Sequence, residues 1–307
     1  GAGPPIAPIG AMGGPAPAMS AGGSMGPTQA PAEPAPAEQA SAEIGTFNTK
    51  QAIVTPEGED EWEIKSAAAT ERWEAILDRT LERFFDRQHR VVMEKARGQK
   101  ARRALVAGGG ALTAAMLLDR AAWDRQIGED VRPVLAGAMV EAAQTAGERL
   151  GFQVSADADY NKTLDAQAAR VEQINQTTAD DVAALIASAE ALEGDDEEKH
   201  TALLTALGAL FVVGMAKRRK RISEIEAQTA MNAGIYHASM QAGAPTKSWR
   251  TRKDERVRPE HRALEGKTVP LSESFKVGAV QLRFPGDPLA PPGLSLGCRC
   301  RLTFGKK

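Results

Sequence analysis

Residues 71–96 read ERWEAILDRTLERFFDRQHRVVMEKA, and this stretch decides the fold class. Its apolar side chains recur every three or four residues, and charged side chains fill the positions between them. The apolar set is Trp73, Ile76, Leu77, Leu81, Phe84, Phe85, Val91 and Val92. This spacing places the apolar groups on one face of a helix, so it predicts a long amphipathic α-helix.

More helices are expected on the C-terminal side of this one. The apolar run 104–118 is interrupted by glycines and, at about fifteen residues, is short for a membrane span, so a buried helix after a glycine turn is expected. Residues 164–192 read as helical, with a second helix starting at Thr177 and Thr178. A long helix is expected from about Lys199 to Gly243, where glycine provides a stop.

The two ends of the chain differ from this helical centre. Half of the 18 prolines lie within residues 1–42, among Gly and Ala, and this composition cannot bury enough apolar surface to offset the entropy of ordering. Residues 1–60 are therefore expected to be a disordered linker, and residues 61–245 a helical region. In residues 246–307, short alternating runs separated by turn residues predict a small α+β domain. The expected fold class is a mainly α-helical stem with a small α+β C-terminal domain.

The C-terminal domain carries chemistry-bearing residues in a fixed order. It has a Trp-x-Thr start, an Asp before an Arg-x-Arg-x-x-His run, a Gly, a Pro-Gly-Asp turn and a closing Cys-Arg-Cys. The positions are Trp249, Thr251, Asp254, Arg256, Arg258, His261, Gly266, Phe275, Pro285, Gly286, Asp287, Cys298, Arg299 and Cys300. This order resembles the C-terminal domain of phage Mu F-like minor head proteins. Glu226 and Asn232 lie in a segment similar to the helix that precedes this domain in the family, and the resemblance covers roughly residues 160–305.

The resemblance implies a minor capsid protein for head morphogenesis of a tailed bacteriophage. Such proteins are associated with the portal vertex and in some cases contact and travel with the genome. Portal and capsid proteins are then the expected partners. The expected location is the virion, inside the capsid near the portal, with assembly in the host cytoplasm. In some phages this domain is fused behind a portal protein, and the Pro/Gly-rich start would suit such a junction. The family gives no reason to expect a cofactor.

Two other function classes stay open as alternatives. The first is an effector enzyme carried in the virion, such as a nuclease, with His261 near Arg256 and Arg258 as the acid–base group. Acid–base cleavage usually needs two placed groups, and one His among arginines is no such constellation, so no catalytic residue is assigned and the chain is not expected to be an enzyme. The second is a membrane-active ejection protein, although a membrane partner is not expected.

A basic run inside the long helix is the candidate contact with nucleic acid. It consists of Lys217, Arg218, Arg219, Lys220 and Arg221. From Lys217 onward basic residues outnumber acidic ones, although the whole chain has a net charge of −2. Such a run can neutralise phosphates without reading sequence, so non-specific DNA binding is expected, with a merely solvated helix face as the alternative.

The paired cysteines admit two interpretations. In the run 298–304, Cys298 and Cys300 share one face with Leu302 and Phe304, which predicts inward-facing core residues of the last strand. A disulfide across one intervening residue would strain the preferred geometry. No metal site is expected, but a zinc site formed by Cys298, Cys300, His261 and Asp254 stays open as the alternative.

Overall fold

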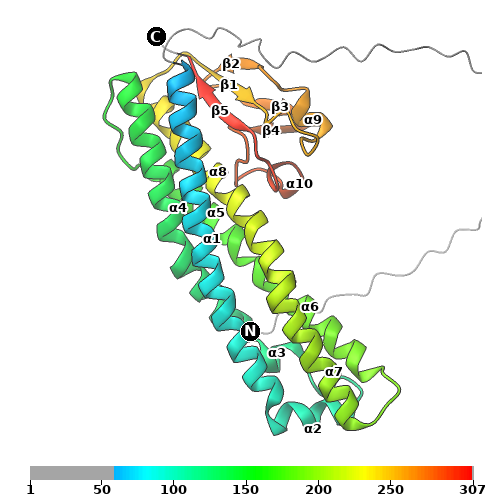
Figure 1. The fold of residues 1–307 in the computed structure, drawn as a ribbon. Coiled ribbons are helices and arrows are strands. Elements are labelled where there is room, and N and C mark those ends of the chain that lie inside the picture. The colour runs from blue at the N-terminus through cyan, green and yellow to red at the C-terminus, as the bar shows by residue number, and fades with distance from the viewer. Residues whose placement is uncertain (1–58, 306–307) are drawn as a thin grey trace, which may run out of the picture. The chain divides into compact units, whose positions relative to one another are not determined.

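The computed structural model describes residues 59–305, so the predicted linker lies almost wholly outside the described residues. The described residues belong to one compact unit. Helices α1 (Glu59–Arg97), α4 (Arg120–Leu150) and α8 (Met215–Ala242) pack against one another and run side by side (Figure 1). The expectation of a helical stem with a small α+β C-terminal domain is confirmed.

The predicted amphipathic face of α1 is confirmed. Leu77, Leu81 and Phe84 are at most 1% exposed, and Phe85 and Val92 are also buried. This face packs against α4 and α8. The helix begins at Glu59, inside the segment assigned to the linker, so the boundary predicted at residue 60 falls just within α1.

Small residues hold α4 and α8 close together. A Cβ on Gly234 of α8 would collide with the carbonyl oxygen of Met139 on α4 and would lie 2.8 Å from the Cβ of Ala142. Neighbouring α4 positions on this face are also alanines, including Ala138 and Ala146, both buried. Side chains this small let the two backbones approach closely, and a larger residue at Gly234 would force them apart.

Helices α2, α3, α6 and α7 lie at the end of the stem away from the strands, whereas α5 contacts the C-terminal domain through Arg170 and Asp159 (Figure 1). The glycine turn is confirmed, since Gly108, Gly109 and Gly110 all have positive φ. The helix expected after it is a single turn, α3, before α4 begins. The bounds are α2 (Gln99–Ala107), α3 (Ala114–Leu117), α5 (Ala158–Glu172), α6 (Ile174–Glu190) and α7 (Asp196–Ala209).

The predicted helix start at Thr177 and Thr178 is wrong. Helix α6 begins at Ile174, and the buried hydroxyl of Thr178 donates to the carbonyl of Ile174 within the helix instead of capping it. A threonine that bonds back one turn satisfies its hydroxyl inside a helix, so its presence does not mark a terminus.

The predicted long helix is confirmed and has one irregularity. Helix α7 begins with a capping box between Asp195 and Glu198 and continues through a π-turn, η1 (Leu210–Gly214), into α8. Helix α8 ends at Gly243, whose φ of 64° is the left-handed conformation that glycine adopts without strain.

The continuous segment Asp196–Ala242 also meets a membrane-span criterion. Its most apolar 18-residue window has a mean hydropathy of 1.5, and only 28% of the window is buried. Val212 and Val213 are 64% and 55% exposed. By length and composition alone, this is the one helix within residues 59–305 that is apolar enough to cross a membrane. A core helix of a soluble protein meets the same criterion, so liposome binding remains the discriminating measurement.

The C-terminal domain is built on a small antiparallel sheet of order β2-β1-β5, with a separate β3–β4 hairpin. Trp249 of β1 pairs with Leu302 of β5, and Lys247 pairs with both Val269 and Phe304. Two short helices lie in the connections. The bounds are β1 (Thr246–Arg250), α9 (Pro259–Arg262), β2 (Thr268–Pro270), β3 (Phe275–Val277), β4 (Val280–Leu282), α10 (Pro292–Ser295) and β5 (Arg301–Phe304).

The sheet buries one lysine, Lys247, which is 1% exposed. Its Nζ lies 4.9 Å from the ring centroid of Tyr236 and 5.5 Å from that of Phe275. Burial, with the nearby positive charge of Arg283, lowers the pKa of Lys247 from 10.5 to about 8. The lysine is therefore held among aromatic faces at the cost of its hydration.

This burial predicts a pH-dependent stability. Between pH 8 and 10.5 the unfolded chain keeps a proton on Lys247 that the folded chain has lost, so the free energy of unfolding should rise with pH across this window. In Lys247→Met this rise should disappear. Urea unfolding of both proteins from pH 7.5 to 10.5 measures the difference, and Lys267→Met, at an exposed position, is the control. Parallel pH profiles for wild type and Lys247→Met would contradict the assignment.

Candidate functional site

The family-motif residues meet where α8 contacts the C-terminal domain, and Asn232 is at the centre of this junction. It is 1% exposed. Its side-chain amide nitrogen donates to the carbonyls of Pro285 (2.9 Å) and Cys300 (2.8 Å). Its side-chain oxygen accepts from the backbone N–H of Leu302 at 3.0 Å. One side chain therefore fixes the Pro-Gly-Asp turn and the Cys-Arg-Cys segment to α8.

A buried ion pair lies beside this amide. Arg170 of α5 donates to Glu226 of α8 at 2.6 Å, and their side chains are only 8% and 5% exposed. Gln167 adds a second donor to the same carboxylate at 3.0 Å. Arg170 also donates to the carbonyl of Gly286 at 3.3 Å. The pair thus joins α5, α8 and the Pro-Gly-Asp turn.

The turn itself explains two motif residues. Gly286 has φ 82°, and a Cβ there would lie 2.7 Å from the hydroxyl oxygen of Thr229, so both its conformation and its surroundings require glycine. Asp287 is 3% exposed and accepts from the Nε and an Nη of Arg283, both at 2.9 Å, and from the backbone N–H of Leu289 at 3.1 Å. Pro285, Gly286 and Asp287 therefore serve to hold the turn against the helices.

The Trp-x-Thr start is also structural. Trp249 is fully buried, and its ring packs edge-on against His261 and Phe275, each with a centroid distance of 5.2 Å. Thr251 donates to Glu265 through its backbone N–H (2.6 Å) and its hydroxyl (2.7 Å). Gly266, at φ 72°, donates to the carbonyl of Trp249.

Each motif arginine has an intramolecular partner. Arg299 donates to Asp254 at 2.8 Å, and Arg256 pairs with Glu224 at 3.4 Å. Arg258 donates to the carbonyls of Leu294 and Leu296. These contacts tie the Asp254–Arg258 loop to α8, to the α10 connection and to the Cys-Arg-Cys segment.

The structure brings His261 and both cysteines together. Their possible ligand atoms all lie within 4.8 Å of one another, and Nδ1 of His261 is 3.8 Å from Sγ of Cys300. The cysteines are free thiols, 3% and 2% exposed. Asp254, the fourth residue of the zinc alternative, is not part of this cluster. The hydrogen bond between the thiols lowers the pKa of Cys298 and raises that of Cys300.

The predicted burial of alternate residues in the last segment is confirmed, but the strand is shorter than predicted. Cys298, Cys300, Leu302 and Phe304 are all buried, whereas Arg299 and Arg301 are half-buried. Strand β5 begins only at Arg301, so both cysteines precede it. His261 is 2% exposed, which leaves the acid–base interpretation without a route to a macromolecular substrate in this conformation.

The structure divides the basic run of α8 into two groups. Arg218 pairs with Asp181 at 2.6 Å, and Arg219 pairs with Asp78 and Glu82. Lys217, Lys220 and Arg221 are exposed. The run is therefore partly an internal brace between α8 and its neighbouring helices, and the exposed three residues are the candidate contact surface.

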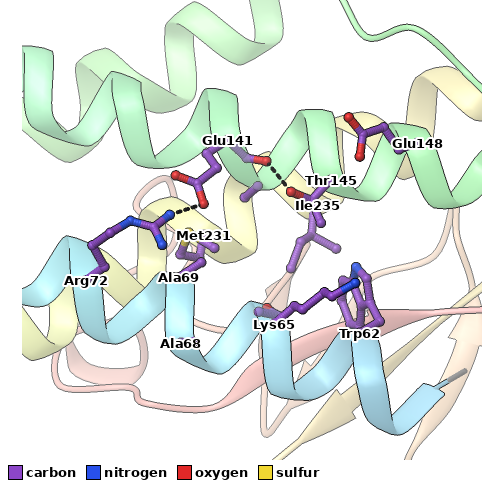
Figure 2. A pocket seen from close by; sticks show the side chains of 12 residues that line it. Trp62, Lys65, Ala68, Ala69, Arg72, Glu141, Thr145, Glu148, Met231 and Ile235 are labelled. Carbon is purple, nitrogen blue, oxygen red and sulfur yellow. Dashed lines mark hydrogen bonds and ion pairs between the residues drawn. The ribbon is translucent and has the colours of Figure 1, made fainter.

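The stem also has a groove of about 390 Å³ between α1 and α4, with Met231 and Ile235 of α8 in its lining. Figure 2 shows Arg72 of α1 reaching across to Glu141 of α4, with which it forms an ion pair. The groove includes none of the motif residues, and Arg72 and Glu141 already pair across it. It therefore reads as a packing gap rather than as the functional site.

Comparison with known families finds a match over the second half of the chain. Residues 158–303 match the family model described as Phage Mu protein F like protein. The match begins at the start of α5 and ends within β5, so it contains the motif residues, Arg170, Glu226 and Asn232, and leaves α1 to α4 outside. No curated protein and no solved structure matches the chain.

Proposed function

We propose that this chain, whose residues 158–303 are a phage Mu F-like region, is a minor capsid protein for head morphogenesis of a tailed bacteriophage. The family match carries the proposal. The geometry supports it, because the motif residues form a scaffold in which Asn232 and the Arg170–Glu226 pair join helices to turns. Such a construction suits an assembly component that presents a rigid surface.

The test is made in the phage that encodes the chain. Mass spectrometry of purified virions should find the chain at low copy number. A nonsense mutation in its gene should give aberrant or non-infectious heads by electron microscopy, and supplying the protein from a plasmid should restore them. Normal infectious heads without the protein would contradict the proposal.

The proposal includes a position near the portal, inside the capsid. Pull-down of the portal protein from infected cells should recover the chain, and virions treated with protease from outside should keep it intact. Recovery with the tail only, or cleavage in intact virions, would remove this part of the proposal and leave the head role standing.

Contact with packaged DNA is the third part, and the exposed basic residues of α8 define its test. Changing Lys217, Lys220 and Arg221 to Gln should weaken binding to duplexes of any sequence. The slope of log affinity against log salt should fall by about 2–3, because each phosphate contact contributes roughly 0.9. The matched control removes the same charge at Lys95, Lys100 and Arg103, which are also exposed. Equal effects of both triple variants, or none, would contradict a specific contact surface.

A further inference from the structure

The cluster of His261, Cys298 and Cys300 combines the three soft or borderline ligand groups that zinc prefers, and all three residues are buried. We propose that these three residues bind one Zn²⁺ ion. Asp254 is left out of the ligand set because Arg299 and the backbone N–H of Arg256 already engage its carboxylate.

The separation of the groups fits coordination. With Zn–N near 2.0–2.1 Å, Zn–S near 2.3 Å and a tetrahedral angle, the nitrogen and sulfur ligands lie roughly 3.6 Å apart. Nδ1 of His261 and Sγ of Cys300 are 3.8 Å apart, and the complete set lies within 4.8 Å. Side-chain movements of up to about 1 Å bring all three to bonding distance.

The space between the groups fits an ion and little else. A cavity of about 10 Å³ is lined by the three residues together with Val257, Gly297 and the arginines 256, 258 and 299. This is at the lower limit for one water molecule. An organic ligand has no room there, whereas a metal ion bonded to the lining atoms needs only a space of this size.

The imidazole of His261 is poorly satisfied without an ion. Its Nδ1 has only the thiol at 3.8 Å, and its buried Nε2 has no hydrogen-bond partner among the described residues. Buried polar groups in a plain core are normally hydrogen-bonded. A metal bond to one ring nitrogen supplies a strong partner that the surrounding protein does not.

The charges of the ligand groups suit Zn²⁺. Two thiolates cancel the charge of Zn²⁺, so the complex with a neutral imidazole carries no net charge. The site is also held in place from outside, since Trp249 packs against the His261 ring and Asn232 binds the carbonyl of Cys300.

The experiment measures metal in the full chain, expressed without a tag and purified without chelator. Elemental analysis should find one zinc per chain. Replacing zinc by Co²⁺ should give the thiolate-to-cobalt charge-transfer absorption of a two-thiolate site. Stripping the metal should lower the melting temperature by several degrees, and added Zn²⁺ should restore it, because the ion binds only the folded chain.

The variants test the ligand set. Cys298→Ser and Cys300→Ser should each lose zinc, and Asp254→Asn should retain it, with His89→Gln as the control for a histidine outside the cluster. A wild-type chain that takes up no Zn²⁺ or Co²⁺ and whose melting temperature ignores both would overturn the proposal, even if the cysteine variants fail to fold. Loss of zinc in Asp254→Asn would overturn the three-residue ligand set. A disulfide between Cys298 and Cys300 in the protein as purified would also overturn it.

Discussion

Asn232→Ala is expected to lower the free energy of unfolding by about 3 kcal/mol or more. The change leaves the carbonyls of Pro285 and Cys300 and the N–H of Leu302 without their partner in a site that is 1% exposed. Each buried group left unsatisfied costs about 1–3 kcal/mol. Urea unfolding followed by circular dichroism measures the loss.

The same variant should separate the domain from the helices. The lost hydrogen bonds to Pro285, Cys300 and Leu302 join α8 to the C-terminal segments, so limited proteolysis should cut within residues 285–305 sooner than in wild type. Asn161→Ala, at an exposed position of α5, is the matched control and should change stability little. A loss below about 1 kcal/mol, the net value of one ordinary hydrogen bond, would show that Asn232 does not hold the junction.

Breaking the buried ion pair is expected to have a similar or larger effect. Glu226→Met leaves the guanidinium of Arg170 buried without its carboxylate, and Arg170→Met leaves the carboxylate unpaired. Removal of one partner from a buried pair costs about 3–5 kcal/mol. The double variant should be less destabilised than the sum of the two, because both buried charges are then gone.

The chain offers a matched exposed pair as the control. Arg132 and Asp165 also lie 2.6 Å apart, but their side chains are 48% and 61% exposed. Breaking this pair should cost less than about 1 kcal/mol, as surface pairs usually do. Equal losses from both pairs, or strictly additive losses at Arg170 and Glu226, would contradict the role assigned to the buried pair.

The sequence predicts best those helices whose two faces differ clearly in polarity. Helix α1 alternates large apolar and charged groups, so its buried face can be predicted. Residues 120–150 lie within the predicted helical region, but no separate helix is predicted there, because Pro133 interrupts the segment and the second half of its buried face is mainly alanine. The place of α4 depends on contact with α8 at Gly234, which no pattern within residues 120–150 reveals.

The candidate site, too, can be predicted only in part. The sequence identified the motif residues, but the spacing does not tell that Asp254 binds Arg299 while His261 lies beside the cysteines. Nor does a run of basic residues tell that Arg219 binds acids on α1, about 140 positions earlier in the chain. Arg170 was missed as a site residue. Its only signal is a charged residue on the buried side of an amphipathic helix, which burial in three dimensions makes clear.

The contact at Gly234 has a consequence for exchanging the two halves of the chain. Gly234 lies inside the family-matching half of the chain, whereas Met139, which makes a side chain there impossible, lies outside it. The two halves are therefore not freely interchangeable modules. A replacement of the first half must supply a helix whose backbone approaches α8 as closely. Otherwise it leaves a gap beside Gly234. Position 234 therefore fits the matched region to a partner helix whose backbone approaches closely.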